Sequence, residues 1–162
     1  MDGAISDTQR TPQQAYQLGL LMAQLHQHSS RWKLPSNFER PLYDANHFYA
    51  SLSKLNSNEQ IRPIDFALCG FGYYLYDVAS ALQYLTSSIR FSFLEGYNTI
   101  RQLPENYIEI VEAFFILAVI DVFSNHVSNP KEHEWLAESV SYVCENHVSR
   151  FLRDEPFLFN LY

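Results

Sequence analysis

The stretch from Arg62 to Ala79 reads RPIDFALCGFGYYLYDVA, and it says more about the fold than any other part of the sequence. Its apolar residues near 60–66 predict a β-strand or hairpin, which Pro63 makes either short or an edge strand. The two glycines of Cys69–Gly72 predict a turn. After the turn, apolar residues recur at helical spacing and predict a helix.

Two aspartates in this stretch are candidate functional residues. Asp65 stands at the end of the apolar segment, shortly before the glycine turn. A strand holds such a carboxylate in place, and the turn leaves room for phosphate oxygens and water around a divalent cation. Asp77 stands near the start of the following helix, where it would accept hydrogen bonds from a neighbouring loop. The alternative is that both aspartates only cap local structure, and their spacing alone favours that alternative.

Outward from this stretch, most of the chain shows helical patterns. Thr11–Gln14 is a helix start, with proline at the first helical position and glutamine three residues after the cap. Gly19 lies on the apolar face of that helix, where it would permit the close approach of another element. The apolar end Pro156–Phe159 is expected to pack on the body of the protein. The fold class is therefore mainly α, with predicted helices at 12–28, 44–55, 74–86, 93–102, 104–126 and 132–154.

The composition is that of a globular protein, and 162 residues predict a single domain over residues 1–162. Hydrophobic residues make up 47% and charged residues 18% of the chain. The formal net charge is -7, and all of it comes from residues 105–162, with 3 basic and 10 acidic side chains. An acidic chain without a basic cluster is a poor ligand for nucleic acid and for anionic membranes, so neither is expected as a partner.

The cysteines, the histidines and the start of the chain bear on cellular context and on metals. Cys69 and Cys144 lie far apart in the sequence, as expected for free thiols in the cytoplasm. The first residues show no signal-peptide pattern, and the longest apolar run, Ala113–Ile120, is well short of the ~20 residues of a membrane span. Histidines 26, 28, 126, 133 and 147 are expected to be core or surface residues, because their spacing does not suit a metal site.

Two sets of motifs resemble the kinase-like phosphotransferases, which include aminoglycoside phosphotransferases, choline kinases and homoserine-kinase-type enzymes. Ile64–Phe66, Cys69–Gly72 and Leu75–Ala79 resemble, in that order, the family's metal-binding strand, its glycine turn and the helix after it. Leu18–His26 resembles the first helix of the family's C-terminal lobe, which ends in an Ala-x-Leu-His pattern. The resemblance spans nearly the whole chain and implies the helical C-terminal lobe of a protein-kinase-like fold.

The resemblance also implies roles for individual residues. Asp65 corresponds to the family's magnesium ligand, which bridges Mg²⁺ to the phosphates of ATP. Asp77 corresponds to a helix aspartate that supports the catalytic loop through hydrogen bonds, and His26 to a structural histidine. Mg²⁺ and ATP are therefore the cofactors that the resemblance implies.

Several family features have no counterpart in the sequence. There is no glycine-rich phosphate loop and no strand lysine. The catalytic loop, of the type His-x-Asp-x-x-x-x-Asn, should precede the strand at residues 60–66, but only Asn56–Gln60 occupies that interval. Catalytic residues are therefore unassigned, and the expectation is a truncated or degenerate phosphotransferase that is inactive as this chain alone.

A non-catalytic role is the alternative. Aromatic residues make up 15% of the chain, and a lobe without its partner lobe would expose apolar surface. This favours a helical interaction module or a homo-oligomer, whereas a partner chain that supplies the missing lobe would restore the enzyme. The acidic residues after position 105 would suit a cationic acceptor, although solvated helix faces explain the same charges.

Overall fold

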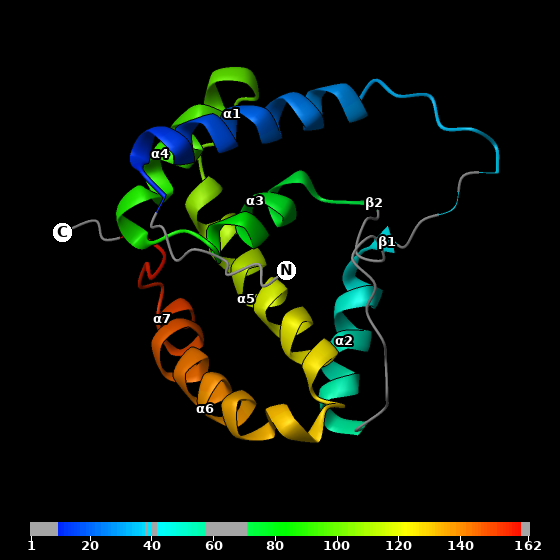
Figure 1. Ribbon diagram of the computed structural model, residues 1–162, viewed down its shortest axis with the longest axis vertical. Helices are drawn as coiled ribbons and strands as arrows, with labels where there is room; N and C mark the ends of the chain where they lie inside the picture. Colours follow the sequence, from blue (N-terminus) through cyan, green and yellow to red (C-terminus); the bar gives the residue numbers. More distant parts are fainter. Residues whose placement is uncertain (1–9, 38, 40–41, 58–70, 160–162) are drawn as a thin grey trace, which may run out of the picture.

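The computed structural model describes residues 10–37, 39, 42–57 and 71–159, and it is built mainly from helices (Figure 1). Helix α1 (Pro12–Ser29) lies across α4 (Ser87–Ile100), and the long helix α5 (Tyr107–His126) runs through the middle of the molecule. Helices α2 (Ala45–Ser57) and α3 (Tyr74–Leu82) both pack on α5. The prediction of a mainly α fold is confirmed.

After α5 the chain forms a further series of short helices. The series consists of the short 3-10 helix η1 (Pro130–Glu132), α6 (His133–Val143), the π-helix η2 (Cys144–Val148) and α7 (Ser149–Phe151). The sequence predicted one α-helix over residues 132–154, but the backbone widens to a π-helix within it and leaves the helix after Phe151. Apolar spacing does not distinguish a π-helix of five residues from the α-helix around it.

A small parallel sheet joins two segments that are distant in the sequence. Strand β1 (Leu42–Tyr43) pairs with β2 (Phe71–Gly72), with Leu42 opposite Phe71 and Tyr43 opposite Gly72. The strand predicted near residues 60–66 lies outside the described residues. The predicted turn at Cys69–Gly72 is wrong for its second half, because Phe71 and Gly72 gain backbone partners from β1 and are extended.

Helix α1 begins with the capping box predicted at Thr11. The Thr11 side chain accepts from the Gln14 amide, and the Gln14 side chain accepts from the Thr11 amide.

The crossing of α1 and α4 depends on two glycines that bring the helix backbones together. A Cβ atom on Gly19 would lie 1.9 Å from the carbonyl oxygen of Phe93. A Cβ atom on Gly96 would lie 2.0 Å from the carbonyl oxygen of Tyr16. The predicted close approach at Gly19 is confirmed.

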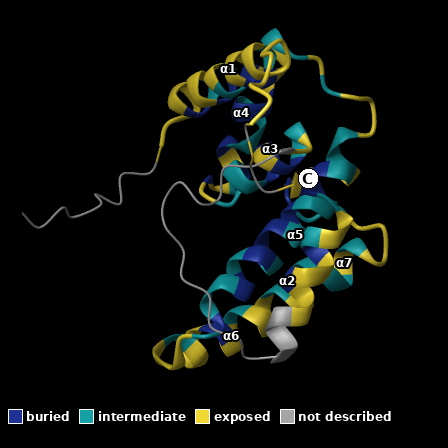
Figure 2. Ribbon diagram, turned by 90° about the vertical axis from the view of Figure 1, so that its right-hand side faces the viewer, coloured by how far each residue is buried: buried dark blue, intermediate teal, exposed yellow. Residues whose placement is uncertain are grey.

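The main hydrophobic core extends from this crossing along α5, and a second, smaller cluster of Tyr43, Phe48, Tyr76 and Ala118 also packs on α5. Figure 2 shows the buried residues along α5. The C-terminal segment closes the main core, as predicted, because Leu158 and Phe159 are buried. The Glu112 carboxylate accepts from the Leu158 amide at 2.9 Å, and Arg90 donates to the Leu158 carbonyl at 2.8 Å. Within the described ranges, no helix is both long enough and apolar enough to cross a membrane.

Candidate functional site

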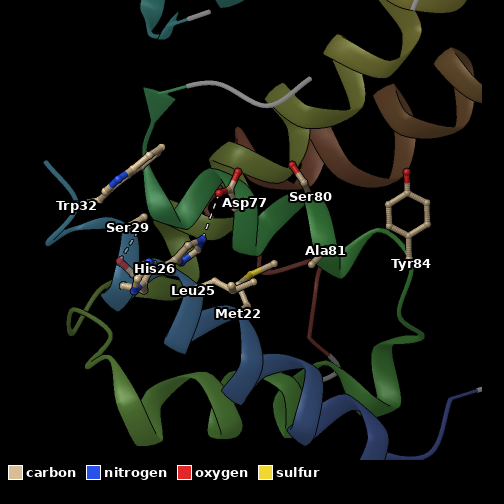
Figure 3. A pocket seen from close by; sticks show the side chains of 10 residues that line it. Met22, Leu25, His26, Ser29, Trp32, Asp77, Ser80, Ala81 and Tyr84 are labelled. Atoms are coloured by element: carbon tan, nitrogen blue, oxygen red, sulfur yellow. Dashed lines mark hydrogen bonds and ion pairs between the residues drawn. The ribbon is translucent and has the colours of Figure 1, made fainter. Parts of the chain in front are cut away.

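His26, in the last turns of α1, meets Asp77, in the first turn of α3. The Nε2 atom of His26 lies 3.2 Å from Oδ2 of Asp77, and its Nδ1 atom lies 2.9 Å from the Tyr97 hydroxyl on α4 (Figure 3 shows the contact with Asp77). The His26 ring also packs on the ring of Tyr74, with centroids 4.8 Å apart. One buried imidazole thus connects three helices.

The proton positions in this contact follow from what each group is able to do. An ionised carboxylate only accepts hydrogen bonds, so Nε2 of His26 donates to Asp77. In the neutral imidazole Nδ1 is then the acceptor, and the Tyr97 hydroxyl donates to it. Burial raises the pKa of Tyr97 to about 12, which keeps that proton on the hydroxyl at neutral pH. Asp77 itself is 61% exposed, so its free oxygen remains open to solvent or to a neighbouring segment.

A groove of about 670 Å³ lies beside this contact, between the end of α1 and α3 (Figure 3). Most of its wall is apolar, and Asp77 and His26 supply polar groups between Trp32 on one side and Tyr84 on the other. The other side chains around it come from α1, from the segment after it and from α3 onward: Met22, Leu25, His28, Ser29, Trp32, Ser80, Ala81 and Tyr84.

A second polar cluster surrounds Asp121, which is buried in the last third of α5. Its Oδ1 atom accepts from Nε2 of His47 at 3.0 Å and from Oγ of Ser51 at 2.6 Å. Its Oδ2 atom accepts from the hydroxyl of Tyr76 at 3.2 Å. Burial, followed by the nearby Asp121 charge, raises the pKa of Tyr76 far above its usual value. The carboxylate therefore ties α2 and α3 to α5.

Sequence reasoning did not find this cluster. Its partners lie 45 to 74 residues from Asp121, and no local spacing connects them. The one signal was the position of Asp121 directly after the longest apolar run, where a buried carboxylate needs donors from elsewhere. The cluster matters for the candidate site because α2 and α3 are the helices on either side of residues 58–70 in the chain.

The structure describes some of the predicted site residues and not others. Asp77 and His26 are brought together, and His26 has the partners of a structural residue. Asp65, Cys69 and Gly70 lie outside the described residues, as does most of the Asn56–Gln60 interval. Over the part of the chain that the structure covers, no three His, Cys, Asp or Glu side chains are grouped to hold a metal ion.

The comparisons with known proteins identify the fold. No family model matches the chain, and no curated protein matches it. A solved structure of the microcompartment-associated aminopropanol kinase matches with a TM-score of 0.66 at 21% sequence identity. The match covers 97% of this chain and 68% of that kinase. The chain therefore has a kinase-like fold, as the sequence motifs implied.

Proposed function

We propose that this chain is a lobe of a kinase-like phosphotransferase that binds Mg²⁺ and ATP through Asp65. The reaction of the parent family is ATP-dependent phosphoryl transfer to a hydroxyl group. The observation that carries the proposal is the contact of His26 with Asp77. It joins the two motifs on which the resemblance to aminoglycoside phosphotransferases and choline kinases depends, although they lie 51 residues apart.

The role of this contact is to position a helix. Asp77 belongs to α3, which begins at Tyr74, nine residues after Asp65. His26 holds Asp77 from a buried site, and Tyr76 of the same helix is held by Asp121. The start of α3 is therefore fixed from two directions. We infer that His26 and Asp77 are positioning residues for the segment that contains Asp65.

The donor set suits magnesium. Mg²⁺ keeps several waters and is commonly held by one or two carboxylates together with substrate phosphates, so one aspartate and the ATP phosphates are sufficient. In this proposal Asp65 supplies the carboxylate oxygen. The bound ion would neutralise charge on the phosphates during transfer.

Transfer itself is not expected from this chain alone. Between His26 and Asp65, no histidine begins the His-x-Asp pattern of the catalytic loop. His28 is followed two residues later by Ser30, and His47 by Tyr49. The imidazole of His47 is instead bound to Asp121. A partner chain or a second copy would have to supply the catalytic aspartate.

Calorimetric titration with ATP, with and without Mg²⁺, tests the proposal. We expect magnesium-dependent binding to the unmodified chain and at least tenfold weaker binding to Asp65→Asn. Asp154→Asn is the matched control, because it also removes one acidic charge. Its backbone is left-handed, with φ of 57°, a conformation that asparagine also adopts, so ATP affinity should not change.

Two results would count against the proposal. Equal ATP affinity for Asp65→Asn and the unmodified chain would show that Asp65 is not the ligand. Absence of ATP binding to the folded chain would favour the alternative of a non-catalytic interaction module. The feature that supports this alternative is a row of exposed leucines on α1, formed by Leu18, Leu21 and Leu25.

A further inference from the structure

A cavity of about 600 Å³ lies where the start of α3 meets the connection between α4 and α5. It is lined by residues 72–75, by residue 97 on α4 and residues 101–104 after it, and by Ile110 and Phe114 on α5. Among the described residues that line it, Arg101 is the one charged side chain. The chain as a whole carries a net charge of -7, so a cavity whose single charge is positive stands out and favours an anionic ligand.

The guanidinium of Arg101 is held by an aromatic ring and keeps its hydrogen-bond donors available. Its Cζ atom lies over the ring of Tyr74, 3.9 Å from the centroid, well within the roughly 6 Å over which cation–π contacts act. Within the described residues, its N–H groups make no hydrogen bond or ion pair with the protein. By contrast, Arg10, Arg90 and Arg150 all donate to backbone carbonyls. Arg101 therefore has donors for a ligand.

The support beneath the guanidinium is fixed before any ligand binds. The ring of Tyr74 packs on the imidazole of His26, with centroids 4.8 Å apart, and His26 is bound to Tyr97 and Asp77. The backbone of Arg101 caps the end of α4, where its amide donates to the Tyr97 carbonyl at 3.0 Å. An arginine restrained at its backbone and at its guanidinium loses little conformational entropy when it binds a ligand.

The other walls select the body and the charge of the ligand. The rings of Tyr73 and Phe114 lie 5.4 Å apart, and Leu75 and Leu103 add apolar surface. One guanidinium balances one carboxylate, and its planar fork matches the two carboxylate oxygens. A phosphate monoester carries a charge of about -1.5 to -2 at pH 7, and its excess charge has no cation among the described lining residues.

We propose that this cavity binds a small monocarboxylate with an apolar or aromatic body. The carboxylate oxygens accept hydrogen bonds from the Arg101 guanidinium, and the body of the ligand packs against the rings of Tyr73 and Phe114. This site goes beyond the proposed function, because it does not depend on Mg²⁺ or ATP.

The probes 3-phenylpropionate and 3-phenylpropanamide test this, because they share a body and only the first is an anion at pH 7. Binding is followed by NMR titration of the full chain without Mg²⁺ or ATP, so the result does not depend on Asp65. We expect the carboxylate to bind at least tenfold more tightly than the amide. Arg101→Gln should weaken carboxylate binding at least tenfold, the effect of a lost charge-assisted pair, and leave amide binding unchanged. Arg31→Gln, at an exposed position outside the cavity, is the control and should leave both affinities unchanged.

A second variant keeps the test decisive if Arg101→Gln does not fold. Ile110 lines the cavity and is partly exposed, so Ile110→Trp should fill the space and abolish carboxylate binding. The proposal is overturned if the folded chain does not bind the carboxylate, or if either variant binds it as tightly as the unmodified chain. Tighter binding of phenyl phosphate than of 3-phenylpropionate would also overturn it, because the site would then be one for phosphate.

Discussion

Gly19→Ala is expected to destabilise the protein by about 3 kcal/mol, although alanine is the better helix former. The added Cβ would lie 1.9 Å from the Phe93 carbonyl oxygen and 2.9 Å from the Tyr97 backbone nitrogen, distances that require the helices to separate. The opposing atoms belong to backbone, so a side-chain rotation does not relieve the clash. Because α1 carries His26, the separation would also disturb its contact with Asp77.

Urea unfolding followed by circular dichroism measures this effect. In an unobstructed helix the same substitution stabilises by roughly 0.5–1 kcal/mol, so the sign alone separates the two cases. Gly96→Ala should match Gly19→Ala, because its Cβ would meet the Tyr16 carbonyl. Gln24→Ala, at an exposed position of α1, serves as the control and should change stability by less than about 0.5 kcal/mol. A stabilised Gly19→Ala variant would contradict the described crossing.

Asp121→Ala is expected to cost about 3–5 kcal/mol of unfolding free energy. The substitution removes the acceptor of His47, Ser51 and Tyr76 at once and leaves their donors in a buried site. Ser51→Ala removes one of the three bonds and should cost only about 1 kcal/mol. The large loss of unfolding free energy in Asp121→Ala therefore comes from losing all three hydrogen bonds together.

Hydrogen exchange shows which helices the Asp121→Ala substitution destabilises, as well as by how much. In Asp121→Ala, amides of α2 should exchange faster than those of α1, because Asp121 binds two side chains of α2 and α1 is held separately by α4. Ser124→Ala is a matched control on the same helix, since within the described residues the Ser124 hydroxyl donates to the Asp121 carbonyl one turn away. If Asp121→Ala unfolded with the free energy of the unmodified chain, the buried network would be refuted.

Local chemistry was enough to predict the parts of the fold that depend on neighbours in the sequence. The capping box at Thr11 fixed the start of α1, and the apolar segment after Pro104 identified the central helix α5. The start of α4 was misplaced, because its first turn from Ser87 is polar and the apolar pattern becomes clear only near Phe93. Strand β1 follows a proline-rich segment, and its pairing with β2 depends on a partner nearly thirty residues away.

In the candidate site, too, local features could be predicted from the sequence, whereas contacts with distant residues could not. The resemblance singled out Asp77 and His26, and the fold brings them together. Tyr97, which completes the contact, gave no signal in the sequence, since a tyrosine on an apolar helix face is ordinary core. Asp121 had a local signal but no visible partner. The contact of Arg101 with Tyr74 joins the end of α4 to α3, and no local spacing connects the two residues.

Anomalous diffraction from crystals of the chain grown with Mn²⁺ and a non-hydrolysable ATP analogue tests the central claim most directly. Mn²⁺ takes the place of Mg²⁺ at oxygen ligands and is located by its own scattering. We predict one manganese peak between the Asp65 carboxylate and the phosphates, at roughly 2.1 Å from a carboxylate oxygen. A bound nucleotide whose manganese lies away from Asp65, or crystals with neither ion nor nucleotide, would contradict the account.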